Sequence, residues 1–492
     1  MATKPTIVPL YINGKHIVSS STAAARRLVP VISSSRIAKG QDGVVHHAQG
    51  ATVEQALEAA KAAKAAFPAW RKSSVEDRRD ILRGAADLLE KRREEGIEIS
   101  MLESCPEKNY ATFIYDMTVA HVKEWSTALA SALRPTIPVS DEHGCFPIIF
   151  REPVGPVLGI APWNAPSILA MRSFAIPIAA GCPTVFKTSE LSPATHMHVA
   201  QSLIDAGLPA GVLNVVHSRF EDSADIVSSL ISSPEIRKVN FTGSTALGRQ
   251  LGVEAARNLK PILLELGGKA SVIVLEDADL AEAAKQILIG AWMNQGQICM
   301  STERVFVQSS VYDKLIDQIK ITAKQLEPAF GGYPQAAERY AKRINGMVRN
   351  AVNEGAELVH GNLDLLTGTT LTPTVLTNVN PKSEIYTDET FGPTVYIQKM
   401  DTVQEMIDAT NASDYGLTAG LWTKDMVRGL KIARQIDSGA VHINGMTVHD
   451  GPTLPHGGVK NSGIGRFGAE WGIQEFTQTK TVRMNGFDSA VF

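Results

Sequence analysis

The chain is poor in cysteine and has no C-x-x-C pair. Its 492 residues include four cysteines, Cys105, Cys145, Cys182 and Cys299. So few cysteines in a chain of this length do not form a disulfide framework, and a zinc site built from cysteine pairs is not expected. The sequence therefore predicts free thiols, no bound metal and a reducing compartment.

Long apolar runs and blocks of one charge are also missing. Every apolar-rich stretch is interrupted by Pro, Gly or charge well before about 20 residues, so no membrane span is expected. The formal net charge is −3, and no basic block indicates nucleic-acid binding. Segment 1–15 has no charged leader followed by an apolar stretch, so we predict a cytoplasmic protein.

Helix signals dominate the first part of the chain. Thr52 and Gln55 form a capping-box pattern ahead of an Ala-rich run, which we expect to close at Pro68. Ser73 and Glu76 repeat the pattern ahead of a second run. The apolar positions of that run share one helix face: Leu82, Ala85, Ala86 and Leu89.

Short apolar runs alternate with helical stretches from about residue 150 onward. Hydrophobic residues make up 44% of the chain, which is ample for large cores. The alternation predicts parallel sheets with helices on both faces, and such sheets bind ligands at the carboxyl ends of their strands. The expected strands are 157–161, 184–187, 212–216, 239–242, 271–275 and 304–308, with helices over 196–206 and 279–292.

Two segments compete as a phosphate-binding loop. Gly463–Gly468 matches G-x-G-x-x-G, but 454–462 before it is loop rather than strand, so a Gly-rich loop that shapes a site or an interface is favoured. Phe241–Gly248 lacks that spacing but follows a strand and enters a helix. Its backbone amides, with the hydroxyls of Ser244 and Thr245, can hold a pyrophosphate. An ordinary β–α turn explains it equally well.

A carboxylate also stands at the end of an expected strand, in the sequence from Lys187 to Glu190. A carboxylate in that position can accept both hydroxyls of an adenosine ribose and would repel a 2′-phosphate. A cap on the following helix is the alternative.

Cys299 is a lone cysteine, a type of residue that is more often buried and inert than reactive. Glu265 leaves a strand into a Gly pair, and Asn164 stands in a turn stiffened by Pro162 and Pro166. A thiol, a carboxylate and an amide donor together suit acyl chemistry through a covalent intermediate. Spacing alone leaves open whether the three side chains meet.

An ordered set of motifs resembles the aldehyde dehydrogenase superfamily over nearly the whole chain. Three further segments, 163–172, 294–303 and 443–450, are similar to the salicylaldehyde, benzaldehyde and vanillin dehydrogenases of bacteria and fungi. The superfamily motifs are Pro162-Trp-Asn164, Lys187-x-x-Glu190, Phe241-Thr-Gly-Ser244, Glu265-Leu-Gly-Gly268, Gly296-Gln-x-Cys299, Glu389-Thr-Phe-Gly-Pro393 and Gly457-Gly-Val-Lys-Asn-Ser-Gly463.

The resemblance implies an α/β fold in three parts. A Rossmann-like cofactor domain would comprise 1–128 and 150–265, and an α/β catalytic domain would comprise 266–465. A small β oligomerisation flap would comprise 129–149 and 466–492 and would build homodimers or homotetramers. The Gly-Ser-Thr helix entry is this family's phosphate site, which favours the loop at 241–248 over the other candidate.

The resemblance also implies the chemistry. Cys299 would attack an aldehyde, Asn164 and the Cys299 backbone N–H would hold the oxyanion, and Glu265 would activate water to release a carboxylic acid. Two alternatives stay open. A CoA-acylating or aliphatic semialdehyde dehydrogenase of the same fold is one, although Glu265 argues against acyl transfer to CoA. A non-catalytic binding protein is the other, although the intact set argues against it.

The expected cofactor is NAD, with NADP possible. Glu190 favours NAD, although some relatives with this residue accept both. Thr390 and Thr394 stand where many relatives carry aliphatic residues, which questions the packing of that motif. The implied cofactor-binding residues are Trp163, Lys187, Glu190, Gly243, Ser244, Gly248, Glu389 and Phe391.

An aromatic aldehyde is the expected substrate, and Arg172 is the informative residue. In the salicylaldehyde-type relatives an Arg lies at the pocket and can bond a ring hydroxyl, whereas a salt bridge is the alternative. Met446, Val448 and His449 are expected in the same tunnel. His456 stands where Phe is common, and no role is assigned to it.

Overall fold

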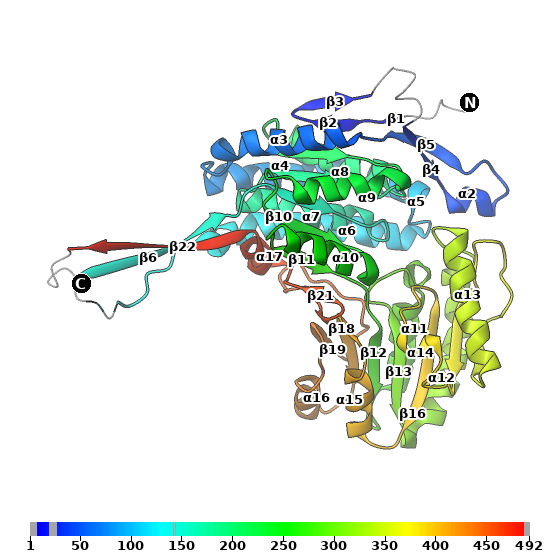
Figure 1. The fold of residues 1–492 in the computed structure, drawn as a ribbon. Helices are drawn as coiled ribbons and strands as arrows, with labels where there is room; N and C mark the ends of the chain where they lie inside the picture. Colours follow the sequence, from blue (N-terminus) through cyan, green and yellow to red (C-terminus); the bar gives the residue numbers. More distant parts are fainter. Residues whose placement is uncertain (1–6, 19–26, 141, 143, 487–492) are drawn as a thin grey trace.

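The computed structural model describes residues 7–18, 27–140, 142 and 144–486. Its α/β architecture confirms the class predicted from the alternation of short apolar runs and helical stretches. The described chain forms two large sheets, each covered by helices, and a two-stranded arm that projects away from both (Figure 1).

The first large sheet has the strand order β21-β11-β10-β7-β8-β9-β2-β3 within the described residues. Its parallel centre consists of near-continuous apolar residues, because both faces are covered. Antiparallel strands lie at the two edges. The parallel strands are β7 (Val157–Ile160), β8 (Thr184–Lys187), β9 (Leu213–Val216), β10 (Lys238–Thr242) and β11 (Ile262–Glu265), and the edge strands are β2 (Leu10–Ile12), β3 (Lys15–Ile17) and β21 (Gly463–Ile464).

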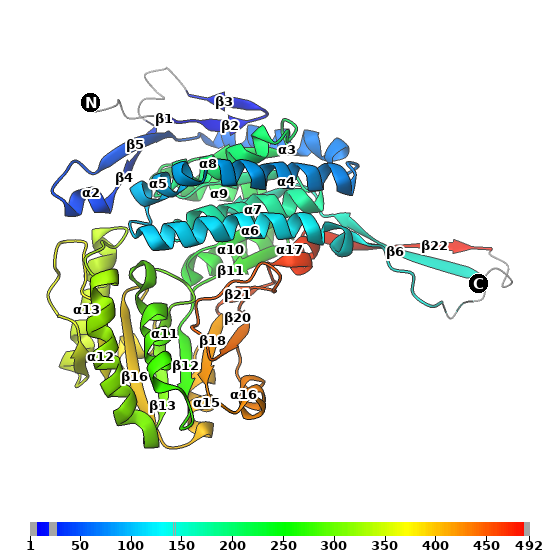
Figure 2. The ribbon, with the colours of Figure 1, turned by 180° about the vertical axis from the view of Figure 1, so that it is seen from behind.

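Helices cover both faces of this sheet. One set, in front in Figure 1, encloses a core with the sheet: α3 (Val53–Trp70), α9 (Phe220–Ser232) and α10 (Thr245–Arg257). The other set encloses a larger core, with α4 and α6 in front in Figure 2. It consists of α4 (Val75–Lys91), α5 (Arg93–Glu103), α6 (Lys108–Leu133), α7 (Pro166–Ala180) and α8 (Pro193–Asp205).

The capping box at Thr52 and Gln55 is confirmed at the start of α3, but the predicted end of that helix is wrong. The helix passes through Pro68 and ends at Trp70. A proline in the last turn removes a single helical hydrogen bond. The buried Trp70 side chain, whose Nε1 donates to the carbonyl of Ile178 at 3.1 Å, anchors that turn against α7.

The second capping box lies one residue later than predicted. Ser74 and Asp77 form it, not Ser73 and Glu76. The hydroxyl of Ser73 is engaged elsewhere, because it accepts a hydrogen bond from Nε of the buried Arg78 at 2.9 Å. The predicted buried face of α4, from Leu82 to Leu89, is confirmed.

The second large sheet has the order β14-β15-β16-β13-β12-β18-β19. Helices α11 (Leu280–Trp292) and α12 (Tyr312–Phe330) pack on one face, and α15 (Val403–Asn411) and α16 (Met426–Ala433) pack on the other. Helices α13 (Glu338–Asn353) and α14 (Glu384–Thr387) cover its β14 end. The strands are β12 (Ala270–Val274), β13 (Thr302–Gln308), β14 (Glu357–His360), β15 (Thr374–Thr377), β16 (Thr394–Met400), β18 (Thr418–Trp422) and β19 (Ala440–Ile443).

The arm pairs β6 (Cys145–Pro153) with β22 (Thr477–Asn485) in antiparallel register, and it follows α17 (Ala469–Glu475) (Figure 1). Residues 487–492 of the predicted flap lie outside the described residues. The predicted boundary at 265/266 falls between β11 of the first sheet and β12 of the second. The domain limits themselves stay a prediction.

Shorter elements complete the described chain. A small sheet near the N-terminus contains β1 (Ile7–Val8), β4 (Leu28–Ile32) and β5 (Val44–Gln49), with α2 (Ser34–Ala38) after β4. In the Gly-rich region expected to be loop, β20 (Val459–Lys460) pairs with β17 (Tyr415–Gly416). Among the described residues, none of the helices combines the length and the apolarity that crossing a membrane requires.

The two sheets meet where the segment after β11 touches the loop before β13. That loop begins with the short helix η1 (Met293–Gly296), in which Asn294 and Gln295 have φ values of 50° and 58°. Gly268 packs directly on its far end, because a Cβ added at Gly268 would overlap the carbonyl oxygen of Cys299. The contact admits no side chain at residue 268.

Gly268→Ala should therefore destabilise the protein by about 1–3 kcal/mol through overpacking. The matched control is Gly252→Ala in α10, where an added Cβ meets no heavy atom within 4 Å. We expect the control to be neutral or slightly stabilising, because Ala is the better helix former. Urea denaturation of both variants measures the difference. Equal midpoints would contradict the close approach at Gly268.

Candidate active site

Cys299 lies in the wall between two cavities. One cavity, of about 230 Å³, is lined by Cys299 together with Trp163, Glu389 and Phe391. The other, of about 30 Å³, is lined by Cys299 together with Glu265 and a set of apolar and aromatic side chains. The thiol can therefore meet different molecules from its two sides.

Glu265, at the carboxyl end of β11, faces this thiol. Its Oε1 is 3.8 Å from Cys299 Sγ. Burial raises the pKa of the Cys299 thiol well above its ordinary value, and the negative charges of Glu265 and Glu389 raise it further. Cys299 is therefore a thiol at neutral pH, and it can become a nucleophile only when its proton is lost.

The carboxylate of Glu265 is ionised at neutral pH. Burial opposes the charge of this carboxylate, which is 1% exposed, but His456 and Arg172 outweigh burial and lower its pKa. Arg172 Nη1 donates to Oε2 at 3.2 Å, and His456 Nε2 lies 3.0 Å from Oε1.

Asn164 also lines both cavities beside Cys299. Its side-chain Nδ2 donates to the backbone carbonyl of Gln297 at 3.0 Å, and its backbone carbonyl accepts from Asn294 Nδ2 at 3.1 Å. These bonds tie the turn after β7 to the cysteine loop. A side-chain amide has two N–H donors, so the second N–H is left for another acceptor. The three residues Cys299, Glu265 and Asn164, which spacing alone could not bring together, meet here.

A larger cavity of about 1070 Å³ adjoins the first and shares with it the side chains of Trp163 and Ser244. Lys187 and Glu190 line this cavity, and Lys187 Nζ donates to Glu190 Oε1 at 2.5 Å. Thr242, which lines both cavities, has a buried hydroxyl without a partner in the described chain.

The entry to α10 suits a phosphate. Gly243 lines both the cavity of about 1070 Å³ and the cavity of about 230 Å³, and Ser244 is the N-cap of the helix. The first backbone N–H groups of a helix are free to bind an anion. Together with the carboxylate of Glu190, these donors fit a dinucleotide. Gly248 lies outside the lining, where an added Cβ would overlap Leu266, so the structure shows it as a packing position.

Glu389 and Phe391 enclose the cavity nearest Cys299. Glu389 Oε1 accepts from the backbone N–H of Gly268 at 2.8 Å. Burial and the charge of Glu303 raise the pKa of Glu389 to about 8. Phe391 meets Trp163 edge-on with centroids 6.0 Å apart, and Tyr340 stacks on the same Trp at 5.8 Å.

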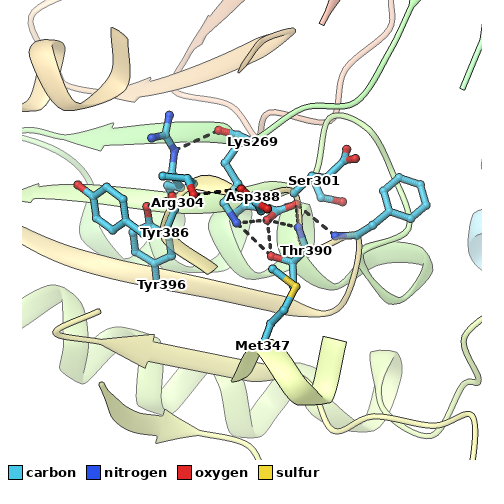
Figure 3. Close-up of polar contacts among 12 residues, drawn as sticks. Lys269, Ser301, Arg304, Met347, Tyr386, Asp388, Thr390 and Tyr396 are labelled. Carbon is cyan, nitrogen blue, oxygen red and sulfur yellow. Dashed lines mark hydrogen bonds and ion pairs between the residues drawn. The ribbon is translucent and has the colours of Figure 1, made fainter. Parts of the chain in front are cut away.

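A buried polar cluster holds this segment in place (Figure 3). The carboxylate of Glu303 accepts from the backbone N–H of Thr390 at 2.9 Å, from the hydroxyl of Thr390 at 2.5 Å and from Lys269 Nζ. Lys269 also donates to the Thr390 hydroxyl at 3.1 Å. Thr390 is thus a member of a buried hydrogen-bond network.

Glu303 and Lys269 have no role predicted from the sequence. A signal was present, because each is a charged residue close to the apolar part of a buried strand, β13 or β12. A buried charge of this kind requires a partner. The partner lies more than thirty residues away in the chain, so only the fold reveals the pair.

The small cavity behind Cys299 is mostly apolar and aromatic. Val448 and His449 line it as predicted, and Arg172, Glu265 and Asp450 form its charged part. Met446 is not among its lining residues and packs against the main core instead. The other lining side chains include Tyr110, Phe113, Ile114, Met117, Ile168, Leu169, Ile298 and Met300.

Comparison with known proteins agrees with this geometry. The model of the aldehyde dehydrogenase family matches residues 33–482. A vanillin dehydrogenase of Pseudomonas fluorescens is 40% identical over 483 residues, which cover 97% of this chain and 98% of the relative. A salicylaldehyde dehydrogenase of Pseudomonas putida is 38% identical over 486 residues, which cover 97% of this chain and 98% of the relative.

The solved structure of a salicylaldehyde dehydrogenase from Pseudomonas putida G7, complexed with salicylaldehyde, has the same fold. It superposes with a TM-score of 0.92 at 36% identity and covers 98% of this chain and 99% of the other. Members of the family use NAD or NADP. With the fold, the cysteine site and the family match in agreement, the chain belongs to the aldehyde dehydrogenase family and is an NAD(P)-dependent aldehyde dehydrogenase.

Proposed function

We propose that this enzyme oxidises an aromatic aldehyde to the carboxylic acid with NAD, through a thiohemiacetal and a thioester on Cys299. The observation that carries the proposal is the small cavity behind the thiol, whose walls are aromatic and aliphatic apart from one charged group of residues. Apolar and aromatic walls of this kind favour contact with an aromatic ring over a polar chain. The names of the vanillin and salicylaldehyde dehydrogenases among its relatives support the same substrate class.

In the first step, Cys299 Sγ loses its proton to solvent and forms a bond to the aldehyde carbon. Glu265, whose Oε1 lies 3.8 Å away, stays ionised for the later hydrolysis. Negative charge then develops on the aldehyde oxygen. The free N–H of Asn164 and the backbone N–H of Cys299 stabilise that charge. Loss of one such donor in another enzyme costs on the order of 10²–10³ in rate.

Trp163, Glu389 and Phe391 line the cavity on the other side of Cys299 and would hold a nicotinamide ring, which would supply a hydride acceptor. Loss of hydride would convert the carbon bound to Cys299 into a thioester carbon. Glu265 then takes a proton from a water molecule, whose oxygen attacks the thioester. The C–S bond breaks, the acid leaves and Cys299 recovers a proton. One aldehyde and one water thus yield one acid, with two electrons passed to the cofactor.

NAD rather than NADP is part of the proposal. Glu190 lines the large cavity and is 2.5 Å from Lys187, so a carboxylate stands where it can accept ribose hydroxyls. The same carboxylate would repel a 2′-phosphate. We further propose a homodimer or homotetramer built through the β6–β22 arm, in a cytoplasmic location consistent with four free cysteines in the described chain.

The function is tested by following NADH or NADPH formation with benzaldehyde, 2-hydroxybenzaldehyde, vanillin and straight-chain aldehydes. We expect aromatic aldehydes to give the higher kcat/KM and NAD to be preferred. Acid must accumulate without added coenzyme A. A strict requirement for coenzyme A, or preference for straight-chain aldehydes, would contradict the proposal.

Cys299→Ala is the negative control in this assay, because it removes the nucleophile but leaves the cofactor cavity. It should lower kcat by several orders of magnitude, as loss of an enzyme nucleophile does. Cys145→Ala is the matched control, because Cys145 lies in the arm, far from the cavities. It should keep its activity. If Cys299→Ala keeps most of the activity, the nucleophile is wrong.

Glu265→Gln should separate the two half-reactions. An amide cannot take a proton from water, so thioester hydrolysis slows by a factor of about 10²–10⁴. Hydride transfer in the first turnover should be affected less. Stopped-flow measurement at 340 nm should show a burst of NADH followed by a slow steady state. Equal loss of both phases would show that hydrolysis is not the main task of Glu265.

Arg172 is the proposed contact for a ring hydroxyl. It lies in the wall of the small cavity, and its buried Nε–H has no acceptor in the described chain. Arg172→Leu should lower kcat/KM for every substrate, because it also removes a partner of Glu265. The additional loss for 2-hydroxybenzaldehyde over benzaldehyde should be about tenfold, the value of one hydrogen bond to a charged group. Equal losses would exclude hydroxyl recognition.

A further inference from the structure

Glu265 belongs to a closed ring of four buried charged or titratable side chains. Arg172 bridges two carboxylates, because Nη1 donates to Glu265 Oε2 at 3.2 Å and Nη2 pairs with Asp450 Oδ2. His456 bridges the same two carboxylates from the other side. Its Nε2 lies 3.0 Å from Glu265 Oε1, and its Nδ1 lies 3.9 Å from Asp450 Oδ1.

All four side chains are at least nine-tenths buried. Burial of an unpaired charge is costly, and the alternation of carboxylates with nitrogen-bearing side chains around the ring gives each carboxylate two partners that offset that cost. Other polar groups face the ring from each neighbouring element. His121 Nε2, on α6, lies 3.4 Å from Asp450 Oδ1, and Cys299 Sγ lies 3.8 Å from Glu265 Oε1. His449 lines the cavity, and the ring of His442 contacts it.

The ring holds both oxygens of the base. Oε2 is held by Arg172 and Oε1 by His456, so the plane of the carboxylate is fixed and Oε1 faces the thiol. The other members of the ring also have opposite effects on the pKa of Glu265. His456 and Arg172 lower the pKa of Glu265, whereas Asp450 raises it. Two neighbours therefore keep the base ionised while the third limits the loss of its basicity.

We propose that His456 and Asp450 are positioning residues for thioester hydrolysis, which act with Arg172 to hold Glu265 ionised and aimed at the carbon bound to Cys299. This inference rests on the proposed role of Glu265 as the hydrolytic base. Asp450 acts through Arg172, whose Nη2 it engages, so that the guanidinium is shared between two carboxylates. His456 acts directly on Oε1 of the base.

The test is the pH dependence of kcat for His456→Phe, which fills a similar volume without a donor or a charge. Removal of His456 raises the pKa of Glu265, so the base becomes protonated at a higher pH. The acid limb of kcat should move up by about one pH unit, the effect of one lost neighbouring charge. Single-turnover NADH formation at pH 8 should stay within about threefold of the wild type, because hydride transfer does not use the aimed base.

His456→Gln separates orientation from charge, because its amide N–H can donate to Oε1 but carries no charge. It should recover most of the kcat at pH 8 that His456→Phe loses, while the acid limb stays at the higher pH. The matched control is His360→Phe. His360, in β14 of the second sheet, has its Nε2 3.2 Å from Oε2 of Glu327, in α12. Replacement of this His by Phe therefore breaks a His–Glu pair remote from Cys299. Its pH profile should overlay that of the wild type.

Coincident pH profiles for His456→Phe and the wild type would overturn the proposal, as would equal loss of the single-turnover rate and kcat. The wild-type enzyme distinguishes this failure from failure of the proposed function. If the wild type makes acid and the Glu265→Gln variant loses steady-state turnover, Glu265 is established as the base. In that case only the positioning role of His456 and Asp450 is refuted. If Glu265→Gln leaves kcat unchanged, the role of Glu265 itself is wrong.

Discussion

A buried, ionised carboxylate next to a partly buried thiol is the constraint on which the rest of this site depends. Glu265 is 1% exposed and lies at the end of a strand in the middle of the molecule, where a lone charge would cost several kcal/mol. Arg172 and His456 make the charge tolerable, and Asp450 in turn balances Arg172. These partners come from α7 and from the loops around 450 and 456. Glu265 can therefore ionise only when three parts of the chain are in place: the first sheet, its covering helix α7 and the segment after β19.

The cofactor side follows the same principle with a different carboxylate. Glu303 is buried in β13 and holds the backbone of Thr390 and Phe391, and Lys269 balances its charge. The charge of Glu303 in turn contributes to the raised pKa of Glu389. Two buried ion pairs, one on each side of Cys299, thus fix the two segments that surround the thiol. Such pairs add little net stability but are costly to break, which suits a role in fixing geometry.

Most of the elements near the site could be predicted from short apolar runs. Strand β8 agrees with its prediction at both ends, and the other predicted strands agree within two residues. Helix boundaries were less predictable. Helix α3 continues past Pro68 because the buried Trp70 side chain anchors its last turn. The next helix is capped by Ser74 and not by Ser73, because the Ser73 hydroxyl is hydrogen-bonded to Arg78. In both cases a tertiary contact outweighed a local preference, which pattern analysis of neighbouring residues cannot include.

The sequence by itself determined the α/β class, the family and the identity of the thiol, carboxylate and amide at the site, because these are carried by motifs a few residues long. Only the tertiary structure decided how Glu265 is held. Arg172 is far in the chain from Asp450 and His456, and each of the three alone has an ordinary alternative as a salt bridge, a loop carboxylate or a core histidine. Charge–charge interactions depend on distance in space and on burial, and neither quantity can be obtained from the order of residues along the chain.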